Sequence, residues 1–183
     1  MIAITSLLDK KHTERVLELI ENLERRFGLR GVKMTPYPHL TLLTAEIPDM
    51  QEMKEYLDQI CLETTPFKIR TTGLGIFPGP NPVIYTPVLR TPLLNNFHDR
   101  LHRDIAEMSS EMGVYYNPNM WLPHISLALG DTSQELLGPI LAFLSSYNFN
   151  WEIELNNLTL LQKRGDYFLK DEEFRFVKNE YIF

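Results

Sequence analysis

The chain has 183 residues, of which 44% are hydrophobic and 23% charged, the composition of a globular protein large enough to bury a sizeable core. Its formal net charge is −6, whereas proteins that hold long nucleic acids along their surface are usually basic. The charge therefore argues against a long duplex as partner. It leaves room for a small nucleotide or for the end of an RNA chain.

The single cysteine, Cys61, rules out an intrachain disulfide and is typical of a reducing compartment. Its place at the end of an expected helix favours core packing over catalysis. No basic N-terminal region is followed by an apolar run, and no apolar stretch approaches the roughly 18 residues that span a membrane. We therefore expect a cytoplasmic protein with no membrane partner.

The first half of the chain predicts strand, helix, strand, helix and strand in turn. Asp9 and Asp49 stand at N-cap positions, and Gly28 provides a stop for the first helix. Gly73 and Gly75 in the last strand favour a bulge or a close backbone approach. The expected segments cover residues 2–8, 9–28, 38–45, 48 onward, and 67–77.

The Pro- and Gly-rich segment 78–82 separates this half from a second one with the same order of elements. Thr91-Pro92 is a helix N-cap followed by proline at the first helical position, and Gly113 is expected to end that helix. Gly138-Pro139 is expected to kink or delay the next helix. The expected segments are a strand over 83–89, a helix over 91–113, a strand at His124, a helix after 131–133, a strand over 149–155, a hairpin of 158–162 with 167–169, and a strand over 174–177.

One motif occurs in both halves. Residues 37–43 read Tyr-Pro-His-Leu-Thr-Leu-Leu, and residues 122–128 read Leu-Pro-His-Ile-Ser-Leu-Ala. The composition predicts only about 0.3 Pro-His steps by chance, yet two occur, each followed by the same residue classes. The repeat predicts an α+β fold in which residues 1–183 form one bilobal domain. Its two pseudo-twofold-related lobes, built from about 1–78 and 79–183 with exchange of elements allowed, would be antiparallel sheets with covering helices around a central cleft.

The motif places an imidazole and a hydroxyl on one face of a strand, because residues i and i+2 share a face. His39 then points with Thr41, and His124 with Ser126. Two facing imidazoles suit a reaction in which one removes a proton and the other protonates a leaving oxygen, and histidine titrates near neutrality. Cleavage of a phosphodiester or opening of a cyclic phosphate fits this pair, with the hydroxyls donating to the phosphate oxygens. No metal is required.

The paired motifs, His39-Leu40-Thr41-Leu42 and His124-Ile125-Ser126-Leu127, resemble those of the 2H phosphoesterase superfamily. More narrowly, the chain resembles 2′-5′ RNA ligase-like proteins and RNA 2′,3′-cyclic phosphodiesterases over nearly its whole length. The resemblance implies a duplicated bilobal fold, no metal or other cofactor, two histidines acting as acid and base, and hydroxyls that bind phosphate. It also implies that the first-motif histidine protonates a leaving 2′ oxygen while the second activates water. The residues alone leave that assignment open.

We therefore expect a metal-independent phosphoesterase of the cyclic phosphodiesterase type. It would open 2′,3′-cyclic phosphates, or cleave and in reverse join 2′-5′ linkages, in RNA or nucleotides. A second hypothesis is a non-catalytic module that binds RNA ends or nucleotides with the same residues. The sequence leaves the substrate open among an RNA end, a tRNA fragment, a cyclic nucleotide and an ADP-ribose derivative. A monomer is expected.

Residues around the motifs are further candidates for substrate binding. Aromatic side chains could stack on a base, although packing within the loops is the alternative. Loop cations could attract a phosphate, although such charges are usually solvated. The candidates are Tyr37, Tyr115, Tyr116 and Trp121 among the aromatic residues, and Lys33 and Arg164 among the cations.

The remaining histidines offer a third hypothesis. His98 and His102 lie four residues apart on an expected helix and could share a metal in a metal-dependent hydrolase. No third ligand is evident, so we favour solvated or half-buried helix residues. His12, in the first turn of the first helix, is expected at the surface.

Overall fold

The structure is a computed structural model that describes residues 1–177. Each histidine strand stands between two α-helices along the chain, as the repeat predicts. In chain order the elements are β1 (Ile2–Leu7), α1 (Lys10–Phe27), η1 (Gly31–Met34), β2 (His39–Glu46), α2 (Met50–Glu63), β3 (Phe67–Arg70), β4 (Gly75–Phe77), β5 (Val83–Pro87), α3 (Pro92–Met108), β6 (Glu111–Met112), η2 (Val114–Tyr116), β7 (His124–Ala128), α4 (Gln134–Leu144), β8 (Glu152–Leu155), β9 (Asn157–Arg164) and β10 (Tyr167–Arg175).

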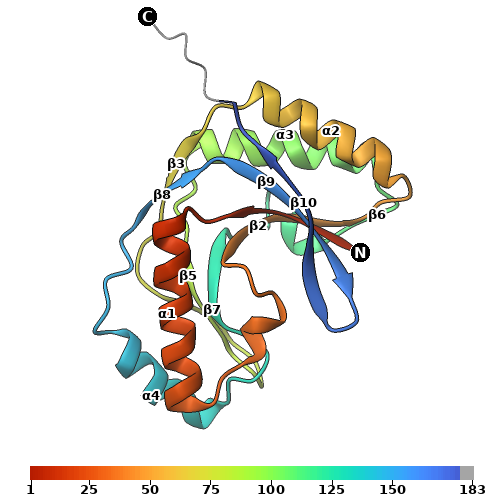
Figure 1. Cartoon of the computed structure of the whole chain (residues 1–183). Coiled ribbons are helices and arrows are strands. Elements are labelled where there is room, and N and C mark those ends of the chain that lie inside the picture. The colour runs from red at the N-terminus through yellow and green to blue at the C-terminus, as the bar shows by residue number, and fades with distance from the viewer. Residues whose placement is uncertain (178–183) are drawn as a thin grey trace, which may run out of the picture.

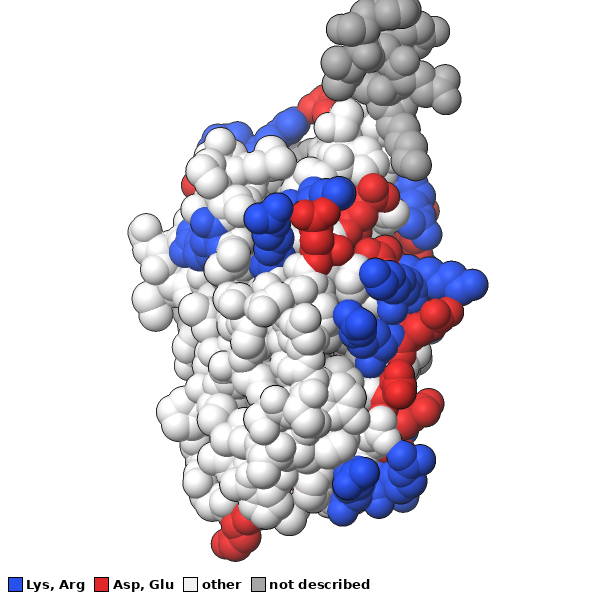
Figure 2. Space-filling view, turned by 90° about the vertical axis from the view of Figure 1, so that its left-hand side faces the viewer, with Lys and Arg blue, Asp and Glu red and all other residues white. Residues whose placement is uncertain are grey.

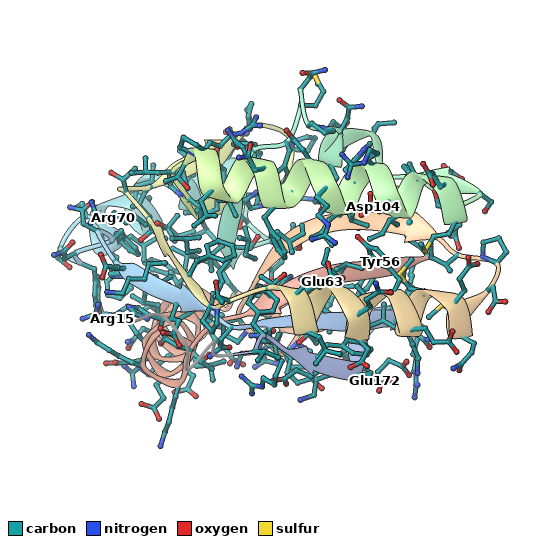
Figure 3. The ribbon with its side chains drawn as sticks, turned by 90° about the horizontal axis from the view of Figure 1, so that it is seen from above. Arg15, Tyr56, Glu63, Arg70, Asp104 and Glu172 are labelled. Atoms are coloured by element: carbon teal, nitrogen blue, oxygen red, sulfur yellow. The ribbon has the colours of Figure 1, made fainter. Side chains whose placement is uncertain are left out.

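The strands form three antiparallel sheets, which confirms the predicted α+β class. The largest has the order β10-β9-β1-β2-β6, and the others are β4-β5-β7 and β3-β8. Helices α2 and α3 run side by side over the five-stranded sheet, while α1 lies against β7 and α4 packs against α1 (Figure 1). Seen from above, Tyr56 and Glu63 on α2 lie near Asp104 on α3, and the Tyr56 hydroxyl donates to the Asp104 carboxylate at 3.0 Å (Figure 3).

The two halves repeat the same strand pairing residue by residue. In the first half, Leu7 lies opposite His39 in the β1–β2 ladder; in the second, Pro87 lies opposite His124 in the β5–β7 ladder. The register shifts once in each ladder, at matching positions: after Ile4 in β1 and after Ile84 in β5. Such a bulge re-aims the residues that follow it. Both histidine strands are therefore presented to their neighbours in the same way.

The halves are interlocked rather than separate. Helix α1 and η1 come from the first half but contact β7, whereas η2 comes from the second half and contacts β2. A glycine is required where each of these short helices begins, because the other half of the chain lies too close for a side chain. A Cβ on Gly31 would lie 1.9 Å from the Leu129 carbonyl oxygen, and one on Gly113 would lie 2.1 Å from Thr44 Oγ1. Each half thus supports the histidine strand of the other. The lobe limits at about 1–78 and 79–183 stay a prediction.

Three expected elements differ from the structure. The expected strand 67–77 is split, because Gly73 adopts φ +60° and the chain moves from β8 to β5 as its pairing partner. Helix α3 ends at Met108 rather than at Gly113, because residues 111–112 pair with the end of β2 as β6. Phe174 continues β10 instead of starting a new strand.

The helix ends and the core follow the local sequence signals. The Asp9 carboxylate accepts the His12 backbone N–H at 2.9 Å, and Gly28 closes α1 at φ 76°. Cys61 is buried in the core, where burial raises the pKa of its thiol to about 12. Among residues 1–177, no helix combines the length and the apolar character needed to span a membrane.

Candidate active site

The two motif histidines line one cavity of about 310 Å³ at the junction of β2 and β7. Thr41 and Ser126 line the same cavity, as the i, i+2 spacing predicts, while Leu40 and Ile125 between them are buried in the core. The predicted set of two imidazoles and two hydroxyls therefore meets in one place. Its other walls come from both halves of the chain: Ala3, Val32, Thr35, Thr44, Phe77, Val83, Tyr116, Leu129, Leu161 and Phe168.

Each histidine is fixed by its own loop. His39 Nδ1 lies 2.5 Å from the Tyr37 carbonyl oxygen, and His124 Nδ1 lies 2.7 Å from the Leu122 carbonyl oxygen. A carbonyl can only accept, so Nδ1 carries the proton in both rings. The neutral imidazoles therefore keep Nε2 as the basic nitrogen. Two bases in matching orientation face one cavity.

Both imidazoles are harder to protonate than free histidine. Burial lowers the pKa of His39, and the nearby His124 lowers it further, while the bond to the Tyr37 carbonyl opposes the shift. Burial also lowers the pKa of His124, with the Leu122 carbonyl opposing. Two like charges so close together are unfavourable. The pair consequently favours states in which at most one imidazole is charged.

The hydroxyl side of the first motif is braced by the loop that precedes β7. The Trp121 indole N–H donates to the Thr41 carbonyl oxygen at 3.2 Å. Burial raises the pKa of Tyr116, and the neighbouring Thr41 side chain opposes this shift. Both side chains line the central cavity. Tyr116 is therefore placed to face whatever binds between the histidines.

Within residues 1–177, two aromatic rings pack against His124 and none against His39. The rings of Phe77 and Tyr85 stack at 4.2 Å, and each lies 5.0 Å from the His124 ring. Gly75 makes room for this cluster, because a Cβ there would lie 2.3 Å from the Tyr85 ring. The backbone repeat is thus symmetric around the two histidines, while the side chains around them are not.

Two recesses flank the central cavity. One of about 400 Å³ adjoins His124 and is lined by Phe77, Tyr115, Tyr116, Met120, Trp121 and Leu122. The other, of about 160 Å³, adjoins His39 and Ser126 and includes Lys33, Tyr37 and apolar residues of α1. Tyr115 is 75% exposed at the rim of the first recess. The four predicted aromatic residues and Lys33 therefore border the cavity or one of its recesses.

The predicted cations Lys33 and Arg164 do not line the central cavity, and both are paired with acidic side chains. Lys33 and Arg30 both pair with Glu24, the latter at 2.8 Å, and Arg164 lies 3.6 Å from Asp171. Within the described residues 1–177, no Asp, Glu, Lys or Arg lines the central cavity. Charged side chains of both signs gather in the upper part and along one edge of the face in Figure 2, and much of that face carries none.

Comparison with known proteins places this geometry in a family. The family model described as the 2′-5′ RNA ligase superfamily matches residues 11–167, which include both histidine strands. The chain belongs to the 2′-5′ RNA ligase superfamily. This confirms the resemblance read from the paired motifs.

Relatives of this superfamily member agree with the assignment. Proteins of Bacillus cereus strains B4264 and ATCC 14579, both named as candidate phosphoesterases, are 26% identical over 145 residues, covering 77% of this chain and 80% of theirs. The crystal structure of TT0787 of Thermus thermophilus superimposes with a TM-score of 0.65 at 16% identity, covering 98% of this chain and 99% of that one. The similarity to TT0787 shows that the two proteins share a fold.

Two other histidines of this superfamily member, His98 and His12, are more buried than the sequence predicts, whereas His102 is half-buried as expected. His98 is fully buried, because it lies in the apolar stripe of α3 between Leu94 and Leu101. His12 is 4% exposed and pairs through Nδ1 with the Asp9 carboxylate at 2.7 Å, so its expected surface position is wrong. Within residues 1–177, no three His, Cys, Asp or Glu side chains are grouped as metal ligands.

Sequence reasoning missed several residues that shape the site. Phe77 and Tyr85 frame His124, and Arg90 donates to the Trp121 and Pro118 carbonyl oxygens at 3.2 and 3.0 Å. None of them belongs to a motif. The only available signal for the first two was an aromatic residue on each of two consecutive expected strands, a pattern that core packing produces equally well.

Proposed function

We propose that the chain is a metal-independent phosphoesterase that opens 2′,3′-cyclic phosphates or cleaves 2′-5′ phosphodiester linkages by acid–base catalysis between His39 and His124. Superfamily membership and the names of the relatives support phosphoesterase chemistry in general. The observation that carries the finer proposal is the matched pair of imidazoles, each with Nδ1 bound to a carbonyl and Nε2 left for the cavity.

The chemistry follows from the protonation states. One neutral Nε2 takes a proton from water as its oxygen attacks phosphorus, and the other, protonated, delivers a proton to the leaving ribose oxygen. The bond from phosphorus to that oxygen breaks as the bond to water forms. After the step, the two imidazoles have exchanged roles. Because both pKa values are lowered, the charged partner gives up its proton readily.

Thr41 and Ser126 are proposed to donate hydrogen bonds to the non-bridging phosphate oxygens. Both hydroxyls share the cavity with the imidazoles, and no cation lines it within residues 1–177. Neutral donors and one imidazolium would therefore carry the stabilisation of the transition state. A single phosphodiester charge suits such a site better than a chain of phosphates.

The flanking recesses are proposed to hold the groups on either side of phosphorus. The recess beside His124 presents aromatic rings to a base, with Tyr115 at its rim and Tyr116 facing the centre. The smaller recess beside His39 presents Tyr37 and Lys33. Trp121 and Arg164 are weaker candidates for direct contact, because Trp121 is only 2% exposed and Arg164, paired with Asp171, lines neither the cavity nor its recesses. The proposed partner is a small nucleotide or an RNA end.

The test is hydrolysis of 2′,3′-cyclic nucleotides and of a 2′-5′ linked dinucleotide in the presence of EDTA, with products identified by chromatography. Wild-type protein is expected to form a phosphomonoester from at least one of them. His39→Ala and His124→Ala are expected to bind the substrate but to turn it over about 10²–10⁴ times more slowly. His102→Ala is the matched control, since that histidine lies on α3 and does not line the cavity.

The alternative of a non-catalytic binding module predicts a different pattern. Nucleotide would then bind to wild-type protein without any product, and the two alanine variants would lose affinity rather than turnover. Binding by calorimetry, measured beside the hydrolysis assay, separates the two. Hydrolysis that disappears in EDTA would contradict the metal-independent mechanism.

A further inference from the structure

Trp121 touches both halves of the proposed site. Its indole N–H donates to the Thr41 carbonyl oxygen in the first motif at 3.2 Å. Its backbone joins directly to Leu122, whose carbonyl oxygen binds His124 Nδ1 in the second motif. A shift of this residue would therefore displace the first-motif hydroxyl and the second-motif imidazole together.

The indole is held by a stacked histidine that is itself anchored to the first-motif strand. The His98 ring stacks on it with centroids 3.7 Å apart and the planes tilted by only 3°. His98 Nε2 lies 3.0 Å from the Leu42 carbonyl oxygen, so the ring is anchored to the first-motif strand as well. Burial lowers the pKa of His98 to about 4, so this histidine stays neutral and keeps its stacking geometry throughout the neutral range.

Arg90 fixes the backbone of the same segment. Its guanidinium donates to the carbonyl oxygens of Trp121 and Pro118 and to the Asn95 side chain, at 3.2, 3.0 and 2.8 Å. The segment that ends in Leu122 is consequently tied to the start of α3. Pro36 stands at the matching place of the first motif and offers no indole. Only one half of the duplicated fold carries this brace.

We propose that Trp121, stacked on His98, is a positioning residue that sets Thr41 and His124 relative to each other. The inference rests on the proposed function, and it assigns Trp121 a role other than contact with the substrate. Its 2% exposure, the His98 ring stacked on it and the Arg90 guanidinium 5.9 Å from its ring centre agree with that role. Catalysis depends steeply on such alignment, because displacing reacting groups by about 1 Å can cost a hundredfold in rate.

The test replaces each of the two tryptophans by phenylalanine. Trp121→Phe keeps a ring for His98 but removes the N–H that binds Thr41. Trp151→Phe is a matched control: Trp151 is also buried, also donates its indole N–H to a backbone carbonyl, that of Asn148 at 2.6 Å, and also packs near a helix histidine, His12. It lines neither the cavity nor its recesses.

Steady-state kinetics are measured on the substrate that the wild-type protein turns over best, at a temperature where all variants are folded. Trp121→Phe is expected to lower kcat about tenfold to a hundredfold with KM within about threefold, and Trp151→Phe to change neither. His98→Leu is expected to lower kcat similarly, while His98→Gln, which keeps a donor for Leu42, recovers part of it. The double variant Trp121→Phe with His98→Leu is expected to lose less than the product of the two single losses.

The measurements separate failure of the positioning role from failure of the proposed function. Equal kcat in Trp121→Phe and Trp151→Phe would overturn the positioning role and leave the proposed function intact. A raised KM with unchanged kcat would show that Trp121 contacts the substrate, which also overturns it. Wild-type protein without turnover on any substrate would refute the proposed function itself, and the inference with it.

Discussion

Asn157 completes the pairing of β1 beside the first histidine. The β1–β9 ladder ends at the pair Thr5 and Thr159, two residues before the pair that would place Leu7 opposite Asn157. Instead, the Asn157 side chain takes over: its Oδ1 accepts the Leu7 N–H at 2.9 Å and its Nδ2 donates to the Leu7 carbonyl oxygen at 2.9 Å. Leu7 lies opposite His39 on its other side. One buried amide therefore replaces a peptide unit in the sheet.

Asn157→Leu keeps the volume of the side chain but removes the partner of both backbone groups of Leu7 and of the buried Thr159 hydroxyl, which donates to Asn157 Oδ1 at 3.0 Å. Each unpaired group costs about 1–3 kcal/mol when it is buried. Leu7 retains some contact with solvent, so the lower part of that range applies to its two groups, and the three groups together cost about 3–5 kcal/mol. For a protein of this size, that lowers Tm by about 6–15 °C.

Urea unfolding followed by tryptophan fluorescence measures the change. Asn150→Leu is the matched control, because Asn150 is exposed and its side chain makes no hydrogen bond within the described residues. The control is expected to change the free energy of unfolding by less than about 0.5 kcal/mol. A loss below about 0.5 kcal/mol in Asn157→Leu would refute the account of the side chain as a backbone substitute.

Three further predictions concern the site and the core. His39→Ala and His124→Ala should each lower kcat by about 10²–10⁴, the contribution of a general acid or base, while Thr41→Ala and Ser126→Ala lower it less; full activity in His124→Ala would contradict the mechanism. Gly75→Ala should destabilise the fold by about 1–3 kcal/mol and lower kcat, because the new Cβ pushes Tyr85 against His124. Calorimetry and kinetics together check this. An unchanged Tm would contradict it, because it would show that the ring cluster can move aside without cost. Cys61 should resist a thiol reagent in the native state and react in urea, because burial raises its pKa and hides it; rapid labelling of folded protein would contradict its place in the core.

Much of the site could be predicted because its signals are local. The Pro-His-apolar-hydroxyl-apolar pattern fixes a strand, its face and the neighbouring hydroxyl within five residues. Duplication then implied that the two strands are equivalent, and the ladders at Leu7–His39 and Pro87–His124 show how closely. Helix caps such as Asp9 and Thr91 are also local, and both cap as expected.

What could not be predicted depends on which elements meet. Helical spacing indicates that α1 and α3 each bury one face, but it does not say that η1 and η2 each dock on the strand of the other half. The split at Gly73 arises from a change of pairing partner, which a continuous apolar pattern hides. The brace of His98 on Trp121 joins residues far apart in sequence.

Some missed features did leave a signal. His98 stands four residues after Leu94 and three before Leu101, the spacing of a buried stripe. His12 stands four residues before Val16 on the buried face of α1, and its partner Asp9 is three residues away. Reading a histidine at a stripe position as part of the stripe would have placed both correctly. A polar side chain can be buried at such a position when a carboxylate or a carbonyl oxygen accepts its hydrogen bond.

The central claim, that His39 and His124 act together as acid and base, is tested most directly by the pH dependence of kcat/KM in EDTA. Activity needs one imidazole charged and one neutral, so the rate should fall both below the lower pKa and above the upper one. Because burial lowers both pKa values below about 6.5, the value of free histidine, the maximum should lie on the acid side of that value. A bell with its maximum there is the predicted result. A profile with a single limb, or one that still rises at pH 9, would contradict it.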